Sequence, residues 1–135
     1  MKAVFVDANV FLRFFTTDDK GQHEKAAVLL RRASAGKVAL VTGPPVLFEI
    51  VWTLRSSYGV TREEVLDVLS RMCGMKGLRM TDADLVEEAV SICRNSGQEF
   101  ADAYIVVSAG RAGAQGIATF NRKHFEKMDA PLYPL

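Results

Sequence analysis

The chain has 135 residues, and its 17 Lys and Arg nearly balance 16 Asp and Glu. This length suits one domain over residues 1–135 with a sizeable core, and the even balance excludes a protein that binds nucleic acid through a uniformly basic surface. Cys73 and Cys93 lack the spacing of a zinc or disulfide motif, which indicates buried free thiols in a reducing compartment. No apolar segment approaches the ~20 residues of a membrane span, so we expect a cytoplasmic protein without membrane contact.

Through the first 80 residues, short β-branched and aromatic runs alternate with segments of helical periodicity. Strands are predicted at residues 3–6, 38–41 and 78–80, and helices at 10–15, 22–35 and 46–57, with a further helix whose core stripe runs from Val65 to Met72. The first strand is expected to be buried on both faces. Asn9 is the expected cap of the first helix, and Thr61 with Glu64 forms a capping box for the fourth.

The remainder of the chain continues this alternation. We predict a helix from Thr81 or Asp82 to Asn95, a very apolar helix over 100–112, a strand over 116–119, a helical turn near 123–127 and a last strand near 132–133. Short apolar strands that alternate with helices imply right-handed crossovers and a parallel sheet covered on both faces. The expected fold is therefore of the α/β class, a three-layer α/β/α sandwich with a central, mostly parallel sheet of four to five strands.

Three of the sixteen carboxylates occur in apolar stretches, where a charge needs a partner or a metal ion. Asp7 interrupts VFVDANVFL, Glu49 lies in VLFEIVWTL, and Asp102 opens the helix FADAYIVV. Each also has a simpler explanation. Asp7 can cap the following helix, and Asp102 can interact with a helix dipole. Glu49 can pair with Arg55 or another cation, although turning Glu49 outward would also expose Trp52.

In parallel α/β sheets, the carboxyl ends of the strands form the crevice in which ligands bind, so acids near those ends should be considered together. Asp7 follows the first strand, Glu49 follows the second by one helical turn, and Asp102 opens the helix before the fourth. Two like charges ~4 Å apart repel by about 4 kcal/mol at an effective dielectric of ~20. A hard divalent cation removes this repulsion, and Mg²⁺ or Mn²⁺ fits oxygen ligands better than zinc because no His or Cys is placed to help.

Four blocks of the chain resemble the PIN-domain nucleases, and among them the VapC-type toxins of prokaryotic toxin–antitoxin pairs. VFVDANVFLRFF resembles the opening strand with its first acid at Asp7, and PPVLFEIVWTL resembles the helix that carries the second at Glu49. FADAYIVVSA resembles the third block with Asp102. GIATFNRKHF resembles the last, with Thr119 as its hydroxyl and Asn121 at the fourth acidic position. The resemblance covers essentially the whole chain.

The resemblance implies a metal-dependent endoribonuclease that uses Mg²⁺ or Mn²⁺. Asp7 and Asp102 would hold the metal ion, and Glu49 would complete its ligand set or act as general base. Thr119 and Asn121 would position the attacking water or a second ion. Many family members have Asp where this chain has Asn121, and the missing charge should weaken a second metal site.

The resemblance also implies an RNA substrate, a small antitoxin protein as partner, and a homodimer. Five basic residues near the motifs are candidate phosphate contacts, or else ordinary solvated charges: Arg13, Arg55, Arg122, Lys123 and Lys127. Trp52, Leu54 and Tyr58 are apolar residues that fit either a dimer surface or the core. His23 and His124 belong to no recognisable pattern, so neither is assigned to catalysis.

Other classes of function remain compatible in part. One is a PIN fold with a decayed site that acts as an RNA- or antitoxin-binding module; Asn121 favours it, and the three retained acids oppose it. An RNA-processing nuclease outside a toxin pair is another. A receiver-like phosphoacceptor domain expects an acidic pair after the first strand and a late Lys at a strand end, and a phosphatase expects Asp-x-Asp. Ala8 and Asn9 follow Asp7, which fits neither.

Overall fold

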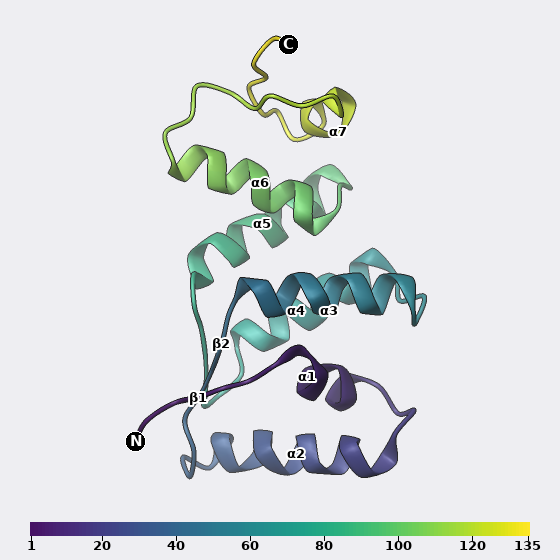
Figure 1. The fold of residues 1–135 in the computed structure, drawn as a ribbon, viewed down its shortest axis with the longest axis vertical. Coiled ribbons are helices and arrows are strands. Elements are labelled where there is room, and N and C mark those ends of the chain that lie inside the picture. The colour runs from purple at the N-terminus through teal and green to yellow at the C-terminus, as the bar shows by residue number, and fades with distance from the viewer. The chain divides into compact units, whose positions relative to one another are not determined.

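The computed structural model describes residues 1–135 and contains three strands and seven helices (Figure 1). In chain order these are β1 (Val4–Phe5), α1 (Ala8–Phe15), α2 (Lys20–Ser34), β2 (Leu40–Thr42), α3 (Pro44–Ser56), α4 (Arg62–Cys73), β3 (Leu78–Met80), α5 (Ala83–Ser96), α6 (Phe100–Arg111) and α7 (Arg122–Glu126). The chain forms two compact units, Met1–Ala83 and Asp84–Leu135, which are described in turn. None of the helices is both long enough and apolar enough to cross a bilayer.

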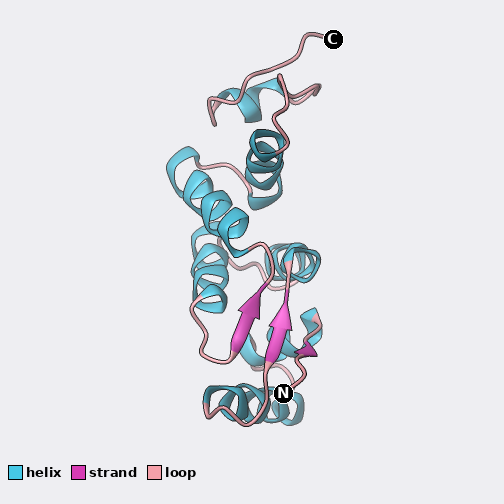
Figure 2. Ribbon diagram, turned by 90° about the vertical axis from the view of Figure 1, so that its left-hand side faces the viewer, coloured by secondary structure: helices cyan, strands magenta, loops and turns pink.

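The first unit is built on a parallel sheet of three strands in the order β1-β2-β3 (Figure 2). Val4 pairs with Leu40, and Leu40 pairs with Leu78, so one row of residues crosses the whole sheet. Helix α1 packs against α2 and α3, and α4 packs against α3 and β3. Because the strands are parallel, their carboxyl ends lie at one edge of the sheet.

The core of this unit consists of apolar side chains from the sheet and the helices. Its most deeply buried members include Phe11, Leu40, Leu47, Ile50, Leu54, Val65, Leu66, Leu69 and Met72. Each such side chain contributes about 1.5–3 kcal/mol through burial. Leu54, considered above for a dimer surface, therefore belongs to the core, whereas Trp52 is 73% exposed.

Strand β1 lies at the edge of the sheet and pairs only with β2. Val6, which follows it, is buried, and its N–H donates to the Val41 carbonyl at 2.9 Å. Val4 and Phe5 are 48% and 58% exposed, so the prediction of a first strand buried on both faces is wrong for these two residues. A short apolar run looks the same in an edge strand and in a central one.

Two helix starts show where local sequence patterns succeed and fail. Thr61 caps α4 by accepting a hydrogen bond from the Glu64 N–H at 3.2 Å, which confirms the predicted N-cap, while the Glu64 carboxylate accepts from the Thr61 hydroxyl at 2.8 Å and not from its backbone N–H. Helix α1 begins at Ala8, earlier than predicted, and its cap is Asp7. The assignment of the cap to Asn9 is wrong, because the carboxylate of Asp7 already meets the first free N–H of the helix.

The second unit contains α5, α6 and α7, and α7 packs against α6. Instead of strands at 116–119 and 132–133 there is one isolated parallel bridge between Ile117 and Leu132. The predicted sheet of four to five strands is therefore corrected to three. Pro131 has no N–H to continue this ladder on one side, and Thr119 turns out of it on the other, so the pairing cannot lengthen.

Candidate active site

Asp7 lies at the junction between β1 and α1. Its backbone is extended (φ −79°, ψ 161°), and its Oδ1 accepts a hydrogen bond from the Ala8 N–H at 2.8 Å. The simpler explanation of this acid, a helix cap, is therefore observed. The residue is exposed and its Oδ2 has no hydrogen-bond partner, so capping leaves one carboxylate oxygen available to a cation.

Glu49 lies in the second turn of α3, the helix that begins two residues after β2. Its side chain is exposed and makes no hydrogen bond or ion pair. The alternative pairing with Arg55 is not observed, and the Nη1 of Arg55 donates instead to the Val60 carbonyl at 3.2 Å. The exposure of Trp52 agrees with an outward direction of Glu49. The Glu49 carboxylate is thus free of internal partners.

A buried hydrogen bond fixes the two strand ends from which these acids extend. Thr42 is 0% exposed, and its Oγ1 donates to the Val6 carbonyl at 2.9 Å. Since Phe5 pairs with Val41, Asp7 leaves the sheet beside the residue that precedes α3. Helices α1 and α3 also pack together. Asp7 and the helix that carries Glu49 therefore start from one edge of the sheet.

Asp102 lies in the first turn of α6, where the helix dipole favours a carboxylate. Its side chain is 27% exposed, and its Oδ2 lies 3.4 Å from the Nδ1 of His124 on α7. Sequence reasoning missed His124, because the packing of α7 on α6 creates this neighbour. The only signal in the sequence was that His124 shares the block GIATFNRKHF with Thr119 and Asn121.

Thr119 and Asn121 form a tight turn that leads into α7. The Asn121 N–H donates to the Thr119 Oγ1 at 2.9 Å, so the threonine hydroxyl fixes the backbone of this turn. Asn121 is exposed, and its side-chain amide has no partner. The amide can therefore bind a water molecule or a substrate oxygen.

The predicted catalytic residues are divided between the two units. Asp7 and Glu49 belong to the first, and Asp102, Thr119 and Asn121 belong to the second. No three Asp, Glu, His or Cys side chains lie close enough together to hold a metal ion. The donors themselves fit a hard divalent cation, because Asp7 and Glu49 both offer carboxylate oxygens that no other side chain binds.

Arg13 joins α1 to the loop that follows it. Its Nε donates to the Gln22 side chain at 2.7 Å, and its Nη1 lies 3.2 Å from Asp18. The Tyr58 hydroxyl also donates to Asp18, at 2.7 Å. The hydrogen bond from Tyr58 lowers the pKa of Asp18 below its ordinary range. A hydrogen bond from Thr16 and the positive charge of Arg13 lower this pKa further. A phosphate that binds Arg13 therefore competes with an existing carboxylate partner.

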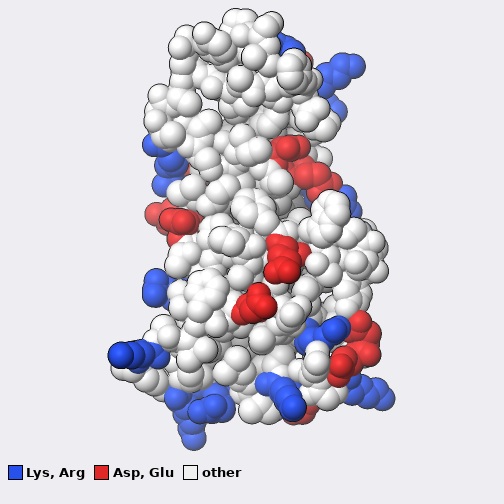
Figure 3. Space-filling model, in the orientation of Figure 1, with Lys and Arg blue, Asp and Glu red and all other residues white.

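The other predicted phosphate contacts are more open. Arg122 and Lys123 are exposed at the start of α7 and make no ion pair, while Arg55 is exposed near the end of α3. Figure 3 also shows basic side chains gathered around α2, at the lower end of that view. Lys25 of α2 lines a hollow of about 550 Å³ together with Asn9 and Arg13.

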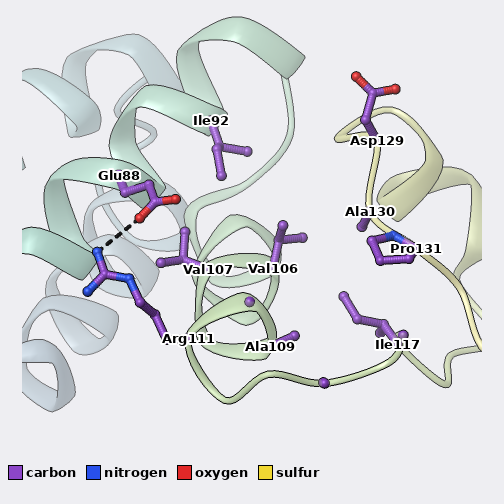
Figure 4. Close-up of a pocket in the computed structure, with 13 residues that line it drawn as sticks. Glu88, Ile92, Val106, Val107, Ala109, Arg111, Ile117, Asp129, Ala130 and Pro131 are labelled. Atoms are coloured by element: carbon purple, nitrogen blue, oxygen red, sulfur yellow. Dashed lines mark hydrogen bonds and ion pairs between the residues drawn. The ribbon is translucent and has the colours of Figure 1, made fainter.

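A hollow of about 440 Å³ lies within the second unit, between α5, α6 and residues 129–131 (Figure 4). Ile92, Val106 and Ile117 face it, and an ion pair of 3.1 Å between Arg111 and Glu88 lies at its side. None of the predicted site residues lines this hollow. Glu88 and Arg111 are paired with each other and most of the remaining wall is aliphatic, so we do not include this hollow in the candidate site.

Comparison with known proteins identifies one family. The sequence profile of the PIN domain matches residues 4–131, a range that spans both units and contains all five predicted catalytic residues. No curated protein matches the chain.

Proposed function

Because this chain belongs to the PIN-domain family, a family of nucleases, we propose that it is a metal-dependent endoribonuclease that hydrolyses phosphodiester bonds in RNA. The observation that carries the proposal is the family match together with the positions of the acids. Asp7 and Glu49 follow adjacent strand ends with carboxylate oxygens that no other side chain binds. Carboxylates with such open oxygens suit a site that recruits a cation.

In this proposal Asp7 and Asp102 would hold Mg²⁺ or Mn²⁺, and Glu49 would complete the ligand set through water. The bound ion would supply positive charge opposite the phosphodiester and make a nearby water more acidic. Carboxylate oxygens as ligands favour these hard ions over zinc, and the proposal gives His124 a role toward Asp102 and not toward the metal ion. His124, whose Nδ1 lies 3.4 Å from the Asp102 Oδ2, orients that carboxylate from α7.

The remaining residues of the site act on the water and on the RNA. Glu49 accepts a proton from the attacking water, a role open to it because its carboxylate has no internal partner. The Asn121 amide holds that water, and the hydroxyl of Thr119 keeps the turn that presents the amide. Arg122 and Lys123 bind flanking phosphates. Attack in line at phosphorus, with departure of the 3′ oxygen, leaves a 5′-phosphate and a 3′-hydroxyl.

We further propose that the protein is the toxin of a type II toxin–antitoxin pair and acts in the cytoplasm. The support is the likeness of its four sequence blocks to VapC-type toxins. A small antitoxin protein would then bind it, and the exposed Trp52 is a candidate contact for a homodimer. Growth arrest on expression, relieved by the product of a neighbouring small gene, would support this role. Normal growth would favour RNA processing instead.

The central test is cleavage of a structured RNA with Mg²⁺ or Mn²⁺ and with EDTA. EDTA should abolish cleavage, and Asp102→Asn should lower it at least about 100-fold, because even outer-shell partners of metal ligands contribute 10–100-fold. Glu87→Gln is the matched control, since Glu87 is an exposed acid of α5 outside the proposed site. Activity that survives EDTA, or equal activity of Asp102→Asn and Glu87→Gln, would refute the mechanism.

A further inference from the structure

Phe120 is the most exposed of the large hydrophobic side chains, at 91%. Five residues later, Phe125 is 3% exposed and anchors α7. The same short segment thus buries one phenyl ring and holds another in solvent. Exposure of an aromatic ring to water is unfavourable, so a ring that the fold leaves exposed is available to bind a ligand.

Two hydrogen bonds fix the backbone around Phe120. The Asn121 N–H donates to Thr119 Oγ1 at 2.9 Å, and the His124 N–H donates to the Asn121 carbonyl at 3.2 Å. A hollow of about 370 Å³ is lined by Phe120, Asn121, Arg122, Lys123 and His124. Its volume is within the range of small-ligand sites. An aromatic ring, two unpaired cations and an amide therefore share one surface hollow.

We propose that Phe120 is a stacking platform for an unpaired RNA base, with Arg122 and Lys123 bound to the phosphates on either side of that nucleotide. The inference rests on the proposed ribonuclease function and narrows the substrate to single-stranded RNA. Every base has a flat face that can stack on a phenyl ring, whereas bases within a duplex already stack on their neighbours. The anionic backbone complements the two cations, which an apolar protein partner would leave unpaired.

Phe120 precedes Asn121, so the stacked base would neighbour the linkage that is cleaved. The ring touches a base and not the reacting atoms, and it is therefore a positioning residue. Its loss should weaken binding of substrate and transition state alike, which raises KM and leaves kcat nearly unchanged. A loss of kcat alone would contradict this role.

Binding can be measured without cleavage by the fluorescence anisotropy of a labelled 12-nucleotide single-stranded RNA in EDTA. Phe120→Ala should raise Kd about 5- to 150-fold, the range reported by alanine substitution at base-stacking aromatics. Phe120→Tyr should restore most of the affinity, while Phe120→Leu, which keeps an apolar side chain without a π-face, should not. Tyr133→Ala removes another exposed aromatic side chain and should leave Kd unchanged.

Stacking also has a direct spectroscopic signature. Trp52 is the only tryptophan, so Phe120→Trp in a Trp52→Phe background places the single fluorophore at the platform. Its fluorescence should be quenched by the single-stranded RNA and much less by a duplex of the same sequence. Equal quenching by both would overturn the proposed preference.

The outcomes separate this inference from the proposed function. If wild-type protein cleaves and binds RNA but Phe120→Ala binds equally well, the platform is refuted and the nuclease stands. If Phe120→Ala changes the oligomeric state in light scattering while Kd is unchanged, the ring serves protein contact. Failure of the wild-type protein to bind either RNA refutes the substrate assignment together with the platform.

Discussion

At the scale of single residues, Asp7 combines a structural and a proposed chemical role in one carboxylate. Oδ1 caps α1, and Oδ2 is free. Asparagine caps helices about as well as aspartate, whereas alanine loses about 0.5–2 kcal/mol. We therefore expect Asp7→Ala to unfold at lower urea than wild type and Asp7→Asn to match it, while both lose cleavage activity.

Urea unfolding and RNA cleavage on the same preparations test this separation of roles. Asp19 caps α2 through the Gln22 N–H and is the matched site, because Asp19→Ala should lose stability and keep activity. An active Asp7→Asn variant would show that the negative charge is dispensable, and Asp7 would then be only a cap.

The candidate site also shows which residue-scale features a sequence reveals. Asp7, Glu49 and Asp102 were found because a charge in an apolar stretch is a local signal. The contact of His124 with Asp102 depends on how α7 packs on α6, and the exposure of Phe120 depends on a turn closed by Thr119. Neither leaves a periodic pattern in the sequence.

At the scale of elements, Gly77 sets how closely the start of β3 approaches α2. Its φ is +85°, and a Cβ added there would lie 2.3 Å from the Ala33 carbonyl oxygen. Gly36 has a similar φ of +77° with nothing within 4 Å. We expect Gly36→Ala to lose about 1–2 kcal/mol from the left-handed backbone alone. Gly77→Ala should lose about 1–3 kcal/mol more, from overpacking against backbone.

Urea denaturation of both variants measures this difference as a larger fall in midpoint for Gly77→Ala. The Gly77 carbonyl accepts a hydrogen bond from the Leu40 N–H at 3.0 Å, so the same change should also disturb the pairing of β2 with β3. Equal losses for the two variants would mean that α2 shifts to accommodate the added methyl group.

Elements with local signals were predictable to within a few residues. The predicted strand 78–80 is β3, and Thr61 starts α4 as its capping box indicated. The expected strands after α6 were wrong, since a strand exists only when a partner supplies hydrogen bonds over several residues. That depends on pairing far along the chain, where Pro131 removes a donor.

At the scale of the whole molecule, the near-neutral charge limits how RNA can be held. With 17 basic and 16 acidic residues, affinity must come from a few local contacts and not from a general positive field. The proposed contacts are Arg13, Arg55, Arg122 and Lys123. Arg13 already has Asp18 as a partner and Arg55 donates to the Val60 carbonyl, so two to four phosphates are the expected number neutralised.

This number predicts the salt dependence of RNA binding. Each phosphate neutralised on a single strand contributes a slope of about −0.7 to log K against log salt, so wild-type protein should show a slope of roughly −1.4 to −2.8. Arg122→Ala with Lys123→Ala should reduce the magnitude by about 1.4. Arg31→Ala with Arg32→Ala, which removes two exposed cations of α2, should leave the slope unchanged. A much steeper wild-type slope, or equal effects of the two pairs, would mean that RNA follows a broader basic surface around α2 and not the few contacts proposed beside Phe120.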